Sequence, residues 1–298
     1  MITYKQKIIL EILRVYGKLD KLLLQKICFL LNKEHNIPIY DFVPYKYGPF
    51  SFTLNNELFS LQKKGLIELN KNSVILKKGE DKIKLNLDYN VIDSILDLYK
   101  RFGNDKKLMI NYIYKKFPYY TQRSKLYQRF DINKKNKKTN NDNEIERINE
   151  NKKYLFTIGY EGKSLERFLN LLIQNEIDIL VDVRNNPISR KFGFSKEKLK
   201  SFCEKLFIKY VHLPQLGIPP EYRKHRSYND LQKLFDFYYK NILLKNIDVI
   251  YNILFYLNSE SKRLAVMCFE RDVNFCHRKF ITNEIEQISK DSIKIIHL

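Results

Sequence analysis

Ile177-Asp178-Ile179-Leu180-Val181-Asp182-Val183-Arg184 is the stretch that decides the fold of the C-terminal half of the chain. Residues 177–183 form a nearly continuous apolar run, and charged side chains stand at its end. A run of this kind is typical of a strand that is buried on both faces of a parallel sheet. The residues around it should then alternate between helices and strands.

Both sides of this run show that alternation. Strands are expected at residues 154–158, 207–213, 264–269 and 293–297. Helices are expected at residues 165–174, 195–205, 229–240, 242–257 and 276–288. The pattern predicts an α/β domain of three layers, with helices on both faces of a mainly parallel, Rossmann-like sheet.

Polar residues follow four of these strands. In a parallel sheet, ligands bind beyond the carboxyl ends of the strands, so this convergence is the strongest functional signal in the sequence. The candidates for acid–base or nucleophilic chemistry are Asp182, Glu270, Cys276 and His277. The candidates for binding a ligand are Gly159, Tyr160, Arg184, Arg190, His212 and Arg278.

Two of these groups have a structural alternative. Asp182 and Arg184 form either a buried ion pair that orients a loop, or an acid–base group beside an anion clamp. Residues 159–162, Gly-Tyr-Glu-Gly, precede a helix. They either bring backbone N–H groups to an anion or form a tight strand-to-helix turn without a ligand.

The cysteine–histidine pair also supports more than one interpretation. Cys276 is expected to open a helix beside His277 and Arg278, which would lower the pKa of its thiol and favour a nucleophile. The alternative is a buried, small hydrophobic side chain. Cys268, Cys276, His277 and His212 together have the composition of a metal site, but their spacing matches no recognised zinc pattern, so no metal is predicted.

Four blocks of this domain resemble a known family. They are Thr157-Ile158-Gly159-Tyr160, Leu180-Val181-Asp182-Val183-Arg184 with Pro187 and Ser189-Arg190, His212-Leu213-Pro214 with Leu216-Gly217, and Cys268-Phe269-Glu270 with Cys276-His277-Arg278. The domain is similar to the bacterial and archaeal family called domain of unknown function 488. The resemblance implies the α/β fold and the position of the site, but no reaction. The first block of that family often ends in His-Ser, and Tyr160-Glu161 stand here instead, so no role of that histidine is carried over.

The first 130 residues have the element order of a winged helix. Helices are expected at residues 5–16, 20–34 and 52–64, and the third ends at Gly65. Two short strands, 66–69 and 74–76, follow around a turn, and further helices are expected at 90–102 and 105–117. Residues 41–50 are expected to form an aromatic loop with two prolines. This front segment is similar to a winged-helix-type extension that is sometimes fused to the family.

Basic residues of this domain are candidates for nucleic-acid contacts. The third helix of a winged helix reads DNA, and Lys63 and Lys64 stand at its end. Residues 106–129 are the stronger candidate, because basic side chains that hold phosphates alternate there with tyrosines that stack on bases. The basic residues chosen there are Lys106, Lys107, Lys115, Lys116, Arg123 and Lys125. The alternative is an amphipathic helix with an ordinary solvated face.

Charge and composition narrow the class of protein. The net charge is +20, and residues 1–130 hold 24 basic and 12 acidic residues, a field that attracts polyanions, nucleic acid first among them. Asn-, Lys- and Glu-rich residues 131–153 are predicted to link a domain of residues 1–130 to one of residues 154–298. No membrane span, signal peptide or disulfide framework is expected, which favours the cytoplasm.

Three functions fit these patterns. The first is a nucleic-acid-associated protein whose α/β domain binds or processes an anionic, nucleotide-like ligand. The second is a non-catalytic winged-helix regulator, or antitoxin-like sensor, in which the α/β half senses a small molecule. The third is a cysteine-dependent enzyme of small molecules. The sequence does not decide whether the protein is an enzyme, and it indicates neither a cofactor nor an oligomeric state.

Overall fold

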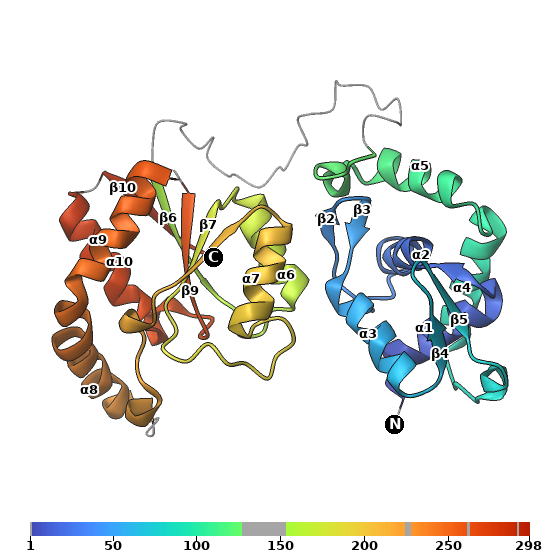
Figure 1. The fold of residues 1–298 in the computed structure, drawn as a ribbon, viewed down its shortest axis with the longest axis horizontal. Helices are drawn as coiled ribbons and strands as arrows, with labels where there is room; N and C mark the ends of the chain where they lie inside the picture. Colours follow the sequence, from blue (N-terminus) through green and yellow to red (C-terminus); the bar gives the residue numbers. More distant parts are fainter. Residues whose placement is uncertain (1, 127–152, 224–227, 261–262, 291) are drawn as a thin grey trace. The chain divides into compact units, whose positions relative to one another are not determined.

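We describe the protein from a computed structural model, which defines residues 2–126, 153–223, 228–260, 263–290 and 292–298. The chain forms two compact units, Met1–Asp142 and Asn143–Leu298. Figure 1 shows the elements of each unit. Of the predicted linker, residues 131–153, only Lys153 lies within the described residues, where it begins a strand.

The C-terminal unit is built on a five-stranded sheet with the strand order β10-β6-β9-β7-β8, in which each neighbouring pair is parallel. The strands are β6 (Lys153–Gly159), β7 (Ile179–Asp182), β8 (Lys209–His212), β9 (Arg263–Cys268) and β10 (Ile293–His297). Strand β9 lies between β6 and β7, although it follows both in the chain. All four carboxyl ends that carry the polar blocks therefore meet at one edge of the sheet.

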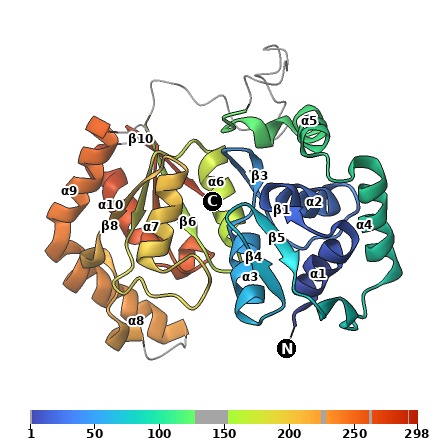
Figure 2. The same cartoon turned by 45° about the vertical axis from the view of Figure 1, so that its right-hand side comes forward.

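Helices cover both faces of this sheet, as Figures 1 and 2 both show. One face carries α6 (Leu165–Gln174) and α7 (Lys196–Lys205). The other carries α8 (Tyr228–Tyr238), α9 (Ile247–Phe255) and α10 (Arg278–Ser289). Each helix buries an apolar stripe against the strands; Ile281 and Ile285 of α10, for example, are fully buried. Burial on both sides explains why the strands read as apolar runs.

The N-terminal unit is mostly helical. Its helices are α1 (Tyr4–Tyr16), α2 (Lys21–Lys33), α3 (Phe52–Lys63), α4 (Tyr89–Phe102) and α5 (Lys106–Lys116). A small antiparallel sheet has the order β1-β5-β4, from Leu19–Asp20, Ser73–Leu76 and Ile67–Leu69. Leucines and isoleucines of α1 and α2 form the centre of one apolar core that also includes residues of α4 and α5.

The predicted fold class, an α/β domain with a parallel sheet beside a helical N-terminal part, is confirmed. Two local predictions were wrong. Residues 41–50 do not form a loop throughout, because β2 (Val43–Tyr45) and β3 (Gly48–Phe50) pair as a hairpin. Helix α10 begins at Arg278, two residues after Cys276. None of the helices in the described ranges has the length and apolarity that crossing a membrane requires.

Candidate functional site

Strand register sets the positions of the residues at the carboxyl edge of the sheet. Asp182 of β7 lies opposite His212 of β8, and Gly159 of β6 lies opposite Cys268 of β9. The chain continues this pairing beyond the strand ends, because the amide of Glu161 donates to the carbonyl of Phe269 at 2.9 Å. The edge is therefore held together by backbone contacts before any side chain is considered.

Asp182 and Arg184 form a buried ion pair on the α7 side of the edge. Nε and Nη2 of Arg184 donate to the Asp182 carboxylate at 2.9 and 2.5 Å, and the Arg184 amide donates to it at 3.0 Å. The hydroxyl of Tyr210 donates to the same carboxylate at 2.6 Å. Asp182 is fully buried, and these four donors occupy its oxygens. The geometry favours the ion-pair alternative over the acid–base alternative.

The remaining guanidinium nitrogen of Arg184 connects this pair to Tyr160. Nη1 donates to the Tyr160 hydroxyl at 3.2 Å, and the Tyr160 ring stacks on Phe194 with 4.4 Å between the ring centroids. Burial lowers the pKa of Arg184, but the hydrogen bonds and charge of Asp182, followed by the contact with Tyr160, outweigh burial and raise that pKa. The guanidinium stays charged and oriented, and Tyr160 acts on it through packing and a hydrogen bond.

His212 and Arg190 occupy different surroundings. Nε2 of His212 lies 2.9 Å from the carbonyl oxygen of Arg184, so this nitrogen carries the proton and the ring supports the loop after β7. Arg190 is exposed on the loop between β7 and α7. The structure does not place either side chain among the cysteines described next.

A second cluster lies on the α10 side of the same edge. It consists of Cys268, Glu270, Cys276 and His277, whose sulfur, carboxylate and imidazole atoms all lie within 4.8 Å of one another. Cys268 Sγ is 3.2 Å from Glu270 Oε2, and His277 Nδ1 is 3.8 Å from Cys268 Sγ and 3.9 Å from Cys276 Sγ. The two sulfurs and the imidazole are buried, and Glu270 is half-buried. The sequence predicted Glu270, Cys276 and His277 as candidates for acid–base or nucleophilic chemistry, and it offered Cys268 only within a possible metal group that included His212 instead of Glu270.

The sequence predicted a lowered pKa for the thiol of Cys276, and the structure indicates the opposite. Burial and the adjacent Cys268 raise the pKa of Cys276, which precedes α10 instead of beginning it. Burial also opposes ionisation of Cys268, but contacts with Cys276, His277 and Glu270 outweigh it and lower the pKa of Cys268. Burial and the charge on Cys268 raise the pKa of Glu270. Of the two sulfurs, Cys268 is the one that favours the thiolate.

Arg278 follows His277 in the sequence, and most of its hydrogen-bonding capacity is unused. Its side chain is 1% exposed, and Nη2 donates to the carbonyl of Glu270 at 2.7 Å. Among the described residues, Nε and Nη1 have no hydrogen-bond partner. A buried guanidinium in this condition is costly, because it has lost water without gaining a partner.

Other cations gather around Arg278 at the turn between β6 and α6. Lys163 Nζ donates to the carbonyl of Gly159 at 3.0 Å, and Lys191 Nζ donates to that of Tyr160 at 3.1 Å. Burial, followed by the charges of Arg271, Arg278 and other nearby cations, lowers the pKa of Lys163. Glu161 opposes this field only in part, since it raises the pKa of Lys191 while burial lowers that pKa overall. The turn is a concentrated positive region.

Comparison with known proteins bears on this unit alone. Residues 164–285 match the family model described as Domain of unknown function DUF488. The C-terminal unit is a DUF488 domain. The match begins just before α6 and ends within α10, and it includes Asp182, Cys268 and Arg278. No curated protein and no solved structure matches the chain.

Two lysines of the DUF488 domain were missed in the sequence. Lys163 stands directly after the Gly159–Gly162 turn, and Lys191 directly follows the candidate Arg190. Each lies in the connection between a strand and the following helix, and a basic residue in such a connection was the available signal. In the structure these lysines, and not Arg190, lie beside the turn.

The candidate nucleic-acid residues of the N-terminal unit are mostly exposed. Exposed side chains include those of Lys63, Lys64, Lys107, Lys115 and Lys125. Two others are already paired: Lys106 with Asp20 at 2.9 Å, and Lys116 with Glu34 at 2.5 Å. Arg123 is half-buried, which lowers its pKa.

The tyrosines of the same segment turn toward the unit's own core. Tyr114 is 1% exposed, Tyr112 donates to Glu34 at 2.6 Å, and the ring of Tyr120 packs edge-on against Phe29. Residues 127–129 of this segment lie outside the described residues. Stacking of bases on these rings is therefore not favoured by the geometry, although the lysines keep their exposure.

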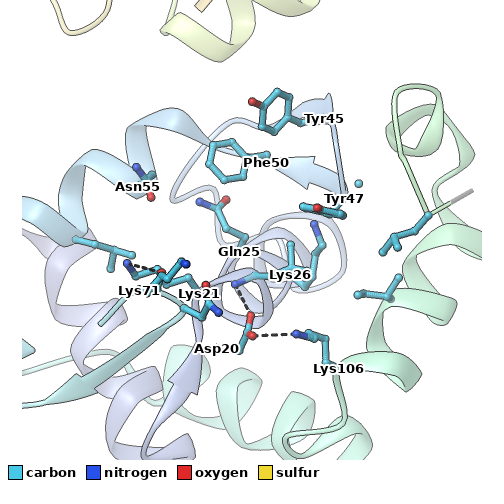
Figure 3. Close-up of a pocket in the computed structure, with 16 residues that line it drawn as sticks. Asp20, Lys21, Gln25, Lys26, Tyr45, Tyr47, Phe50, Asn55, Lys71 and Lys106 are labelled. Atoms are coloured by element: carbon cyan, nitrogen blue, oxygen red, sulfur yellow. Dashed lines mark hydrogen bonds and ion pairs between the residues drawn. The ribbon is translucent and has the colours of Figure 1, made fainter. Parts of the chain in front are cut away.

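A cavity of about 540 Å³ in the N-terminal unit combines rings and lysines. Figure 3 labels Tyr45, Tyr47 and Phe50 together with Lys21, Lys26, Lys71 and Lys106 around it. Lys26 is fully buried and donates to the carbonyl of Pro49 at 2.7 Å, and burial lowers its pKa to about 7. Lys26 thus attaches the β2–β3 hairpin to α2 and fixes the aromatic wall of the cavity.

Proposed function

We propose that the protein associates with nucleic acid and that its DUF488 domain binds an anionic, nucleotide-like ligand at the carboxyl edge of its sheet. The observation that carries the proposal is the buried guanidinium of Arg278, whose Nε and Nη1 have no partner among the described residues. A phosphate or carboxylate accepts two parallel hydrogen bonds from a guanidinium. Such a ligand would satisfy the nitrogens that the protein leaves unpaired.

The charges around Arg278 support an anion instead of a neutral ligand. Lys163 and Lys191 are held at the β6–α6 turn by carbonyls, which accept hydrogen bonds but carry no full negative charge. The mutual repulsion of these cations is part of the reason that the pKa of Lys163 is lowered. A bound oxyanion would remove this repulsion and would gain the attraction of several positive charges in a partly dehydrated site.

Replacement of Arg278 by methionine tests this proposal. Two charge-assisted hydrogen bonds contribute roughly 3–6 kcal/mol, so Arg278→Met should weaken binding of pyrophosphate or a nucleoside diphosphate at least about 100-fold. Isothermal titration calorimetry on the full chain at low salt measures the affinity. The matched control is Lys279→Met, which removes the adjacent, exposed positive charge and should leave the affinity within about threefold.

A second pair of variants guards against misfolding of the Arg278 variant. Lys163→Met and Lys191→Met alter half-buried residues of the turn and should each weaken the same binding. The proposal fails if the wild type binds none of these anions, or if all three variants bind them as tightly as Lys279→Met.

The N-terminal unit is the proposed nucleic-acid contact. Its helices α1, α2 and α3 precede the β4–β5 hairpin, which is the order of a winged helix. Exposed lysines and the lysine-lined cavity in Figure 3 support contact with phosphates. We place the contact on the lysines and not on stacking tyrosines, because the tyrosines pack inward.

A salt titration tests this contact. Lys107, Lys115 and Lys125 are exposed, and each phosphate contact contributes about 0.9 to the slope of log affinity against log salt. The triple change of these lysines to glutamine should reduce the slope by about 2–3, as measured by fluorescence anisotropy with short single- and double-stranded oligonucleotides. The control triple change, at the exposed Lys198, Lys200 and Lys205 of the DUF488 domain, should leave the slope unchanged.

The outcomes separate the three functions. Equal slopes for the two triple variants, or no binding by the intact wild type, would contradict the nucleic-acid proposal. Sequence-specific binding of duplex DNA without turnover would favour the regulator. A small-molecule thiol reaction without nucleic-acid binding would favour the cysteine enzyme.

A further inference from the structure

The four side chains Cys268, Glu270, Cys276 and His277 form a compact set of donors at the carboxyl edge of the DUF488 sheet, and we propose that they bind one zinc ion. They are the group of potential metal ligands found within the described residues, with donor atoms that lie within 4.8 Å of one another. The inference does not depend on the proposed anion, because it uses a different set of side chains.

The distances fit a tetrahedral zinc site. Zinc binds sulfur at about 2.3 Å, and nitrogen and oxygen at about 2.0–2.2 Å, so neighbouring ligand atoms of a tetrahedron lie about 3.3–3.8 Å apart. In the structure, Cys268 Sγ is 3.2 Å from Glu270 Oε2 and 3.8 Å from His277 Nδ1. Cys276 Sγ is 3.9 Å from the same nitrogen. Small side-chain adjustments are enough to centre an ion among these atoms.

The surroundings of His277 support metal ligation. With Nδ1 directed at the two sulfurs, Nε2 lies 3.4 Å from the carbonyl oxygen of Val183. Histidines that bind metals commonly donate their second ring N–H to a carbonyl or a carboxylate, which fixes the tautomer and the orientation of the ring. Val183 lies between Asp182 and Arg184, so the buried ion pair holds the residue that orients the imidazole.

The chemistry of the donors selects the metal. Two thiolates and an imidazole are ligands that favour zinc over magnesium or calcium, which prefer oxygen. Cys268 ends β9, and Cys276 is fixed by the hydrogen bond of its amide to the carbonyl of Val273 at 3.1 Å. The protein therefore supplies two sulfurs and a nitrogen from buried, ordered positions. The half-buried Glu270 supplies the ligand nearest to solvent, the position from which an ion enters.

Metal binding by the full chain tests the proposal. After removal of metal with a chelator, the wild type should bind one equivalent of zinc, measured by plasma mass spectrometry after gel filtration. Cobalt should give the spectrum of a tetrahedral site with thiolate ligands. The double variant Cys268→Ser/Cys276→Ser should lose the zinc. The matched double variant Cys28→Ser/Cys203→Ser, which changes the other two buried cysteines, should retain one equivalent.

Further variants keep the test decisive. Glu270→Gln should keep the stoichiometry but weaken zinc binding about tenfold, and Arg278→Met should keep zinc while it loses the anion. Zinc binding could then stand while the anion proposal fails, or the reverse. The zinc proposal is overturned if wild type binds no zinc, or if it binds cobalt without thiolate charge-transfer bands. Equal zinc binding by the Cys268→Ser/Cys276→Ser variant would also overturn it.

Discussion

Replacing Asp182 with asparagine should destabilise the DUF488 domain by about 3–5 kcal/mol, because it removes one partner of a buried ion pair. Arg184 would remain in the interior, where its side chain is 4% exposed, without the carboxylate that accepts its Nε and Nη2 hydrogen bonds. The hydroxyl of Tyr210 would also lose a charged acceptor. Urea denaturation followed by circular dichroism measures the loss in the free energy of unfolding.

Two further variants serve as controls for the loss of stability in Asp182→Asn. Asp178→Asn changes an exposed aspartate just before the same strand and should cost less than about 1 kcal/mol. The double variant Asp182→Leu/Arg184→Met should regain most of the stability, because hydrophobic replacement of a whole buried pair is often neutral. A loss of less than about 1 kcal/mol for Asp182→Asn would contradict the view that the buried charge of Arg184 depends on this carboxylate.

Gly159→Ala should be the most disruptive single methyl group that can be added at the carboxyl edge. A Cβ at Gly159 would lie 1.8 Å from the carbonyl oxygen of Glu270 and 3.0 Å from Cα of Arg271, which are backbone atoms. The segment after β9 passes directly over the end of β6 and cannot move away without breaking the contacts between residues 160–161 and 268–269. We expect a loss of about 3 kcal/mol, together with weaker anion binding at the turn.

Gly162 provides the control for this effect. It lies three residues later with φ of 72°, and a Cβ there would meet no atom within 4 Å. Gly162→Ala should therefore cost only about 1–2 kcal/mol, which is the conformational cost of a left-handed alanine. Thermal unfolding of the two variants compares the costs directly. Equal losses would contradict the close approach of the Glu270 carbonyl, because Gly159, unlike Gly162, does not lie in the left-handed region.

Much of the DUF488 fold could be predicted because burial on both faces leaves an unambiguous sequence pattern. Residues 177–183 have the pattern of an interior strand, and the polar residues at its end marked the edge where the candidate site lies. The sequence could not reveal which of these polar side chains pair with one another and are therefore not available to a ligand. Three of the four donors to Asp182 come from Arg184, but the fourth is the hydroxyl of Tyr210, a residue of the next strand that carries no signal of its own.

The cysteine cluster shows a different limit. Cys268 and Glu270 lie at and just after the end of a strand, and Cys276 and His277 lie just before a helix. Their spacing in the sequence therefore matches no known metal-binding motif. The combination considered from the sequence included His212 and omitted Glu270. In the structure, His212 lies opposite Asp182 and supports the Arg184 carbonyl. Only the fold, by placing β9 beside the start of α10, shows which donors meet.

The N-terminal errors also have a physical cause. Pro44 and Pro49 argued against strands, yet these two residues stand opposite each other in the β2–β3 hairpin. Two side chains of α2 hold the hairpin in place. Gln25 exchanges hydrogen bonds with the backbone of Ser51, and Lys26 donates to the carbonyl of Pro49. The inward tyrosines of α5 were similarly invisible, because an aromatic side chain that stacks on a base and one that fills a core look the same in a sequence.

The central position of β9 has a consequence for synthesis of the chain on the ribosome. Strands β6 and β7 do not pair with each other; both pair with β9. Residues 263–268 leave the ribosome after β6, β7 and the helices α7 to α9, so the edges of β6 and β7 that pair with β9 stay unpaired until then. The sheet therefore cannot be completed until residues 263–268 have left the ribosome, and the nascent chain offers chaperones an interval in which to bind it.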